Sequence, residues 1–463
     1  MEHQKNSVFR AYVLLILAIV SIIGGLKVLK APTTITLLTG GILVSIVSVL
    51  WGTKWETIEK SLFESVGLMA IGIYITLAIG LLVGSWILSG TVPVMIYYGL
   101  KLLSPSIFLF MTCIICSLMS LMTGSSWGTI GTVGIALMGV SQGLGIPMQY
   151  TAGAIVVGAM FGDKLSPLSD TTIMAPALSG VDIIEHIKHM LYTTVPGYVI
   201  SLILFIILGM QYKTGGDITN SNAQEILSTL QNSFNLNPLL LLPPVVVLFL
   251  IYKKVPSLPV FGIGIILGCI CAGVFQGSSL SEMTTVLNAG FKSESGVKLV
   301  DSMLSRGGMT STLGTVAIIL SAAVFGAPLK AAGVLQVLVN SLSESTKSWK
   351  AIMVGSYITN LIFISITTSY YVCFTVLGPI MQPIFDKFNI PRKNLSRMLE
   401  DTGTALCWII PWGMSGIFAS GILGVPVLEY AIYAPTTYLG IVFAFIYIFT
   451  GFGIGKLEET KIA

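Results

Sequence analysis

Acidic and hydroxyl side chains cluster at 161–172, where the sequence FGDKLSPLSDTT interrupts a long apolar stretch. Asp163, Ser166 and Asp170 are three and four residues apart, so a roughly continuous helix would align them on one face. Thr171 adds a hydroxyl oxygen, and hard cations such as sodium need oxygen ligands. We therefore expect an ion-binding site here, with sodium at Asp163, Asp170 and Thr171.

The same stretch has the residues of a helix break. Gly162 can end one helix and Ser166-Pro167 can start the next. Broken helices at membrane depth expose free carbonyl groups and positive helix ends, both of which bind ions. The alternative is a short loop outside the membrane with solvated charges, because Lys164 lies beside Asp163.

A second cluster, LSRMLEDTGT at 395–404, contains Glu400, Asp401 and Thr402. Acids inside a membrane are costly and are functional candidates by default. We expect these three residues to share the ion-binding chemistry of the first cluster. The alternative is that Arg397 pairs with one of the acids at the membrane surface.

Two uncharged polar segments complete the candidate set, TGSSWGT at 123–129 and TTSYY at 367–371. Unwound, hydroxyl-rich backbone at these places would line an ion or substrate site. The small residues could instead serve helix packing. The candidate residues in the two segments are Ser125, Ser126, Thr367, Thr368 and Ser369.

The elements that position these clusters must lie in a membrane. Of the residues, 54% are hydrophobic and 10% are charged, against about 25% charged in soluble domains, and the mean hydropathy is +0.90. No charged residue lies between Lys101 and Asp163, a stretch far longer than the roughly 20 residues of a membrane-spanning helix. We predict an all-α polytopic membrane protein.

Apolar runs predict two helical series that form a first transmembrane half at 1–212 and a second at 237–463, joined by a polar linker at 213–236. We expect ten to twelve crossings, because several runs are too short to cross alone and suggest broken helices or re-entrant segments near the midplane. The predicted runs are 9–28, 32–52, 66–88, 105–122, 128–141, 149–162, 167–180, 190–212, 237–252, 257–277, 309–328, 350–366, 371–385, 397–424 and 431–452.

The halves look like one unit used twice. A shift of 244 positions places Thr123 on Thr367 and Ser125 on Ser369, and it also matches Ile146-Pro147 with Ile390-Pro391. Weak internal repeats with interrupted polar segments are typical of secondary transporters. The loop 386–397 is rich in Lys and Arg whereas 141–150 has none, so the positive-inside rule places them on opposite sides. We expect an inverted repeat with 386–397 in the cytoplasm.

Enzymatic chemistry is not expected. Ser415 in GMSG resembles a nucleophile motif, but no histidine follows it in the chain to act as a base. His186 and His189 lie in GVDIIEHIKHM, for which we predict an amphipathic helix at the membrane interface. The six cysteines lie in apolar stretches and are expected to act as small hydrophobic residues.

Several segments of the sequence resemble those of a known family. GAMFGDKLSPLSDTT, EHIKHMLYTTVPG, LSRMLEDTGT, IIPWG and LGVPVLEYAIYAP look like the NhaC family of bacterial sodium/proton antiporters, which includes members thought to exchange malate and lactate. The resemblance covers nearly the whole chain. It implies a secondary transporter built from two repeats. On matching positions, the family's ion-binding residues fall on Asp163, Ser166, Asp170, Thr171, Glu400, Asp401 and Thr402.

The chain departs from the family pattern at Ser369, Gly413 and Ile173, where many members have an acid, an asparagine and an asparagine. These departures leave room for an organic solute. We expect sodium/proton antiport across a bacterial cell membrane; the alternative is sodium- or proton-coupled exchange of a small organic acid or amino acid. The expected partners are membrane lipid, sodium, protons, such a solute and a second copy in a homo-oligomer, with no cofactor and no nucleic acid.

Overall fold

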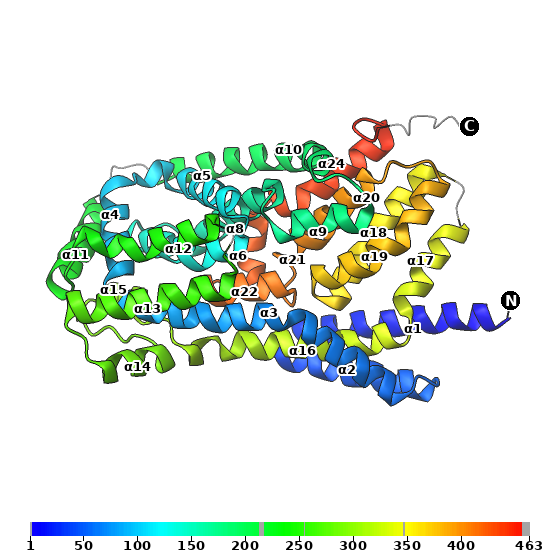
Figure 1. The fold of residues 1–463 in the computed structure, drawn as a ribbon, viewed down its shortest axis with the longest axis horizontal. Helices are drawn as coiled ribbons and strands as arrows, with labels where there is room; N and C mark the ends of the chain where they lie inside the picture. Colours follow the sequence, from blue (N-terminus) through cyan, green and yellow to red (C-terminus); the bar gives the residue numbers. More distant parts are fainter. Residues whose placement is uncertain (1, 213–216, 254, 346–347, 456–463) are drawn as a thin grey trace.

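The computed structural model describes residues 2–212, 217–253, 255–345 and 348–455, and every regular element in these ranges is a helix (Figure 1). Eight of the described helices are long and apolar enough to cross a membrane. They are α1 (Glu2–Ile23, continued by the π-helical turn η1, Gly24–Val28), α2 (Thr33–Leu50), α3 (Trp55–Leu88), α5 (Pro105–Thr123), α10 (Ile183–Met210), α13 (Ser257–Gln276), α16 (Leu313–Ala331) and α18 (Trp349–Thr367).

Two sharply bent helix pairs raise the number of candidate spans to ten, the lower end of the predicted range. Residues 224–233 of α11 (Asp217–Ser233) meet η3 (Pro238–Leu241) and α12 (Leu242–Tyr252) at 100°, and α22 (Met414–Leu423) meets α23 (Val427–Tyr430) and η6 (Ala431–Tyr433) at 90°. The fold is therefore an all-helical polytopic membrane protein, as predicted.

Most of the remaining helices are shorter, and several begin or end at breaks inside the molecule. They are α4 (Thr91–Leu102), α6 (Ser126–Thr129), η2 (Ile130–Gly134), α7 (Ile135–Gly143), α8 (Met148–Leu165), α9 (Asp170–Ser179), α14 (Leu280–Ala289), α15 (Lys298–Leu304), η4 (Met309–Thr312), α17 (Val334–Ser345), α19 (Tyr370–Lys387), α20 (Lys393–Met398), η5 (Leu399–Thr404), α21 (Ala405–Cys407) and α24 (Thr436–Thr450).

Figure 1 shows how these helices are layered. Long helices α3 and α16 pack against each other along one side, and α10 packs with α24 and α5 along the other. The short helices α6, α8, α21 and α22 lie between them. The broken segments are therefore held in the interior, where irregular backbone is covered by protein rather than lipid.

The break predicted within 161–172 is present, but it lies later than expected. α8 continues through Gly162 to Leu165, Ser166 is extended, and Ser169 caps α9 by accepting a hydrogen bond from the Thr172 backbone N–H. Gly162 does not end the helix because it serves close packing: a Cβ there would lie 2.3 Å from the Ser117 carbonyl oxygen of α5.

The polar segments at 123–129 and 367–371 form helix breaks that have the same backbone conformation. Gly124 ends α5 with φ 64° and Thr368 ends α18 with φ 59°, both in the left-handed region. The next residues, Ser125 and Ser369, are extended and start α6 and α19. In both halves a polar segment forms a sharp helix break.

Helix boundaries repeat with the shift of 244 residues that the sequence suggested. α5 matches α18, the run 126–143 (α6, η2 and α7) matches α19 at 370–387, and α9 matches α22, each at both ends. The left-handed caps Gly180 and Gly424 that follow α9 and α22 also match.

The predicted linker 213–236 contains a helix. Residues 213–216 lie outside the described residues, and α11 follows them, with Ile226 and Leu230 buried in the main hydrophobic core. The division into halves at 1–212 and 237–463 remains a prediction.

The helix predicted at 180–190 is present as the start of α10, and its charged residues Asp182, Glu185 and Lys188 are exposed. His186 and His189 are buried instead. His186 Nδ1 lies 2.9 Å from Ser396 Oγ, and His189 Nε2 lies 3.1 Å from Asn394 Oδ1. The two histidines thus pack on α20, a partner more than 200 residues away that a local pattern cannot reveal. The position of this helix at the membrane interface remains a prediction.

Candidate functional site

A cavity of about 270 Å³ lies where α3, α8 and α19 meet the short helices α6 and α9. Two of its lining residues are acids, and none of the described lining residues is Lys, Arg or His. The polar and aromatic side chains that matter most are Ser125, Ser126, Trp127, Asp163, Asp170 and Tyr371.

Five of the described helices begin at this cavity. Ser126, Asp170, Ser257, Tyr370 and Met414 are the first residues of α6, α9, α13, α19 and α22, and all five line the wall. Helix N-termini carry partial positive charge, which stabilises acidic side chains nearby. The breaks therefore place partial positive charge beside the carboxylates of the cavity.

Asp163 lies in the last turn of α8 and is only 9% exposed. Its Oδ2 accepts a hydrogen bond from Ser126 Oγ at 2.8 Å, which joins two of the predicted site segments. Its Oδ1 has no hydrogen-bond partner within the described residues. A buried carboxylate oxygen without a partner is costly, so this oxygen is suited to a cation or a proton.

Asp170, the first residue of α9, is held from the opposite wall. Tyr371 OH donates to its Oδ2, and its Oδ1 accepts from the Thr171 backbone N–H at 3.0 Å. The structure thus brings Asp163 and Asp170 to one cavity across the break between α8 and α9.

Ser125, Ser166 and Thr171 hold the breaks. Ser125 Oγ caps α6 by accepting from the Gly128 N–H at 3.0 Å. Ser166 Oγ accepts from the Leu168 N–H at 3.3 Å, and Thr171 Oγ1 lies 3.0 Å from Ser169 Oγ. Of the three, only Ser125 lines the cavity.

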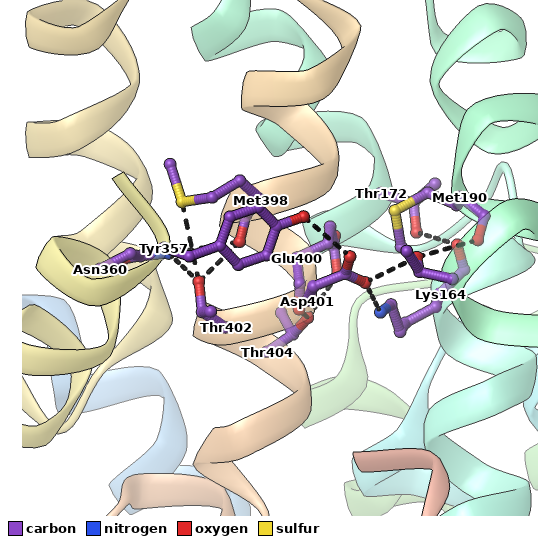
Figure 2. A network of polar contacts seen from close by, with 11 residues as sticks. Lys164, Thr172, Met190, Tyr357, Asn360, Met398, Glu400, Asp401, Thr402 and Thr404 are labelled. Atoms are coloured by element: carbon purple, nitrogen blue, oxygen red, sulfur yellow. Dashed lines mark hydrogen bonds and ion pairs between the residues drawn. The ribbon is translucent and has the colours of Figure 1, made fainter. Parts of the chain in front are cut away.

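Behind the cavity, the two acidic clusters are joined by an ion pair (Figure 2). Lys164 Nζ on α8 lies 2.9 Å from Asp401 Oδ1 on η5, and both side chains are buried, at 3% and 0% exposure. Asp401 also accepts hydrogen bonds from Thr193 Oγ1 at 3.1 Å and from Tyr357 OH at 3.3 Å. Lys164 is therefore not part of a solvated loop, and that alternative is wrong.

Glu400 and Thr402 lie in the same π-helical segment as Asp401 (Figure 2). Thr404 Oγ1 donates to Glu400 Oε2, whereas Glu400 Oε1 has no partner within the described residues. Asn360 Nδ2 donates to Thr402 Oγ1, which in turn donates to the Met398 carbonyl at 2.6 Å. π-helical turns inside α-helices are frequent at functional sites.

Thr367, Thr368 and Ser369 form the second break but do not line the cavity. The Thr368 carbonyl accepts a hydrogen bond from the Met414 N–H at 2.9 Å, which ties this break to the start of α22. The hydroxyls of Thr368 and Ser369 are buried without partners in the part of the chain that the structure describes.

Several members of this network were not predicted. Lys164 was interpreted as a sign of exposure, and Thr193, Tyr357 and Asn360 were not singled out. Their signal was a polar side chain within an apolar run, clearest for Asn360 in 350–366. The alternative in which Arg397 pairs with one of the acids of the second cluster is not seen among the described residues: its hydrogen bonds there go to Asn394 Oδ1 and the Gly453 carbonyl, each at 3.3 Å.

Comparisons with known proteins agree with this architecture. The model of the Na⁺/H⁺ antiporter family matches residues 5–174 and 158–452. The Na⁺/H⁺ antiporter NhaC of Alkalihalophilus pseudofirmus is 35% identical over 440 residues, which cover 95% of this chain and 94% of that protein.

Relatives that are named for other transport activities are similar to this chain to the same extent. The malate-2H⁺/Na⁺-lactate antiporter of Bacillus subtilis is 37% identical over 91% of this chain and 90% of that protein. The arginine/ornithine antiporter ArcD of Halobacterium salinarum is 34% identical over 87% of this chain and 82% of that protein. A polytopic helical fold with buried carboxylates at helix breaks and these full-length similarities lead to one assignment: the chain belongs to the Na⁺/H⁺ antiporter (NhaC) family of secondary antiporters.

Proposed function

We propose that the protein exchanges sodium for protons across a bacterial cell membrane at the carboxylates beside its helix breaks. The observation that carries this proposal is that Asp163 and Asp170 line the same cavity, where Ser126 Oγ donates a hydrogen bond to Asp163. Carboxylate and hydroxyl oxygens suit a hard cation. The relative named as a Na⁺/H⁺ antiporter NhaC, from Alkalihalophilus pseudofirmus, supports the choice of ions.

Exchange follows if sodium and a proton compete for the same carboxylate. A bare buried carboxylate is unfavourable unless a cation or a proton neutralises it. Asp163 Oδ2 is engaged by Ser126, while Oδ1 is left to bind either one. Protonation of Asp163 then releases sodium, and loss of the proton restores the site.

Lys164 and Asp401 have a different part in this proposal. Their ion pair joins the end of α8 in the first half to η5 in the second half, so it couples the two halves of the chain. Glu400, whose Oε1 is unpartnered in the described structure, lies on the same segment and is a second candidate for the proton. Thr402 fixes the segment to α18 through Asn360.

We further propose that residues 1–212 and 237–463 are inverted repeats, related by the shift of 244 residues in their helix boundaries. The contrast in basic residues between 386–397 and 141–150 supports inversion, with 386–397 cytoplasmic. Rocking of one repeat against the other would expose the cavity alternately to the two sides.

Proteoliposomes that contain the purified protein test the exchange directly. A sodium gradient should drive proton movement, read by a dye for internal pH. Asp163→Asn and Asp170→Asn should each abolish this movement, whereas Glu429→Gln, which changes an exposed acid, should retain it. Normal exchange by both aspartate variants would place the ion site elsewhere.

A second candidate function is the exchange of a small organic solute coupled to sodium or protons. Trp127, Tyr370 and Tyr371 favour it, because they give the cavity aromatic walls that a bare cation site does not need. Ile173, one of the departures from the family pattern, also lines the cavity. Adding malate, lactate or amino acids outside the same proteoliposomes distinguishes this candidate, since plain exchange is indifferent to them.

A further inference from the structure

The cavity is larger than a single dehydrated sodium ion requires. Its volume of about 270 Å³ is close to the lower end of the roughly 300–1,000 Å³ range of small-molecule sites. The volume is suited to an organic molecule of modest size. What that molecule is can be argued from the charge and the shape of the wall.

The charge of the wall is negative. Asp163 and Asp170 contribute two carboxylates, and the described lining contains no basic side chain. Asp163 is more than nine-tenths buried, and its Oδ1 has no partner among the described residues. An ammonium group would supply donors and a positive charge to this oxygen.

The aromatic side chains form the other part of the wall. Trp127 is 8% exposed, and its ring stacks on Phe418 with centroids 4.1 Å apart. This packing fixes the indole beside the cavity, and its Nε1 is unpartnered within the described structure. The rings of Tyr370 and Tyr371 lie 4.4 Å apart on α19. Aromatic faces attract organic cations and also cover an apolar carbon body.

We propose that this cavity binds a small organic ammonium ion, with its charged group at Asp163 and Asp170 and facing the ring of Trp127, and its carbon body along the aromatic wall. The inference rests on the proposed function, because the ammonium ion takes the place that sodium would occupy. Sodium and the organic cation therefore compete for the cavity.

The same wall is unsuited to a free dicarboxylate. Carboxylate ligands are usually held by Arg or Lys side chains or by several N–H donors. Here a carboxylate would face two like charges, and the described lining offers no basic residue to offset them. Binding of malate would require the cavity to be rebuilt.

Three compounds that share one branched five-carbon chain separate these possibilities. Isopentylamine carries an ammonium group, 4-methylpentanoate carries a carboxylate, and leucine carries both. Malate is the fourth probe. Thermal unfolding of the full-length protein in detergent reports binding, since a ligand of the folded state raises Tm by mass action. A detergent sample holds no pH gradient, so an amine cannot act by dissipating one.

Isopentylamine should raise Tm, and added NaCl should diminish this shift more than equal KCl does. Neither 4-methylpentanoate nor malate should raise Tm. A shift with malate or 4-methylpentanoate but not with isopentylamine would overturn the proposal. So would a shift with leucine alone, because the carboxylate would then be essential.

Variants of the aromatic wall locate the site. Trp127→Leu should weaken isopentylamine binding by roughly two- to thirtyfold, the loss expected for a cation–π contact, whereas Trp127→Phe should retain most of it. Trp55→Leu changes an exposed tryptophan of α3 and is the matched control. Equal affinity in Trp127→Leu and Trp55→Leu would place the amine outside this cavity.

Failure of the proposed function is distinguishable from failure of this inference. If sodium drives proton movement in proteoliposomes but isopentylamine does not bind, sodium/proton exchange is supported and binding of an organic ammonium ion is contradicted. If isopentylamine binds in competition with sodium but sodium moves no protons, binding of an organic ammonium ion is supported and the proposed sodium/proton exchange is contradicted.

Discussion

Asp163 and Lys164 are neighbours in the last turn of α8, yet they serve two different places. Asp163 lines the cavity, and Lys164 reaches Asp401 on η5. Consecutive helical side chains point about 100° apart, so one helix end can hold both. Any change of charge at the cavity is therefore one residue away from the ion pair that joins the two broken helices.

Removing one partner of this ion pair should destabilise the protein strongly. Lys164→Met leaves the Asp401 carboxylate buried without its cation, which typically costs about 3–5 kcal/mol. The double variant Lys164→Met/Asp401→Asn should recover part of the loss, since neither buried charge remains. Thermal unfolding in detergent measures both variants.

An exposed ion pair provides the control. Arg392 Nη2 lies 2.5 Å from Asp386 Oδ2, and both side chains are more than a third exposed. Asp386→Asn should therefore change the stability by no more than about 1 kcal/mol. If Lys164→Met were as mild as Asp386→Asn, the buried pair would not hold the broken helices together.

At the residue scale, the sequence predicted the cavity acids better than their partners. Asp163, Asp170 and Ser126 stand out because charge or hydroxyl groups are costly inside apolar stretches. Lys164 was misinterpreted because the meaning of a charge depends on its partner, and Asp401 is 237 positions away. Tyr357 and Thr193 have only a weak local signal, since each is a single polar side chain within an apolar run.

At the scale of elements, the matched breaks after α5 and α18 use different residues for one conformation. Gly124 and Thr368 both have positive φ. Glycine adopts this region freely, whereas a β-branched residue there is strained. The Thr368 hydroxyl gains no hydrogen bond in the described structure to offset the strain.

Exchanging the residue types at these breaks should give opposite results. Gly124→Ala should lower the stability by at least about 1 kcal/mol from backbone conformation alone, and its Cβ would lie 2.6 Å from the Leu168 carbonyl carbon. Thr368→Gly should leave Tm unchanged or raise it. If Thr368→Gly preserves Tm but impairs transport, the hydroxyl is a ligand rather than a structural group.

Element boundaries could be predicted where a single sequence signal decides them. The run predicted at 167–180 is close to α9, because Ser169 and Gly180 are ordinary helix caps. The run predicted at 397–424 was wrong as one continuous span, since the helix stops after Cys407 and resumes at Met414. Apolar residues continue through that gap, so hydropathy alone cannot reveal it.

At the scale of the whole molecule, matched helices carry different chemistry. With the shift of 244 residues, Glu400 and Asp401 correspond to Val156 and Val157, and Asn360 corresponds to Cys116. In the first half α8 packs tightly on α5 through Gly158, whose Cβ would lie 2.3 Å from the Cys113 carbonyl oxygen. The second half has the polar network in the matching place. The proposed repeats thus share boundaries but not roles.

Inversion of the repeats makes a prediction about which side of the membrane each matching loop faces. Cysteines introduced by Gln142→Cys and Lys387→Cys lie at nearly matching positions at the ends of α7 and α19. Inversion places them on opposite sides, with Lys387 in the cytoplasm because its loop is rich in Lys and Arg. An impermeant thiol reagent added to intact cells should then label Gln142→Cys, and Lys387→Cys should be labelled only after the membrane is opened.

The parent chain is the control, because five of its six cysteines are buried and Cys269 is partly buried. Labelling of both variants from the same side would mean that the two halves are parallel copies. The proposed mechanism, in which one inverted repeat rocks against the other to expose the cavity to each side in turn, would then lose its structural basis.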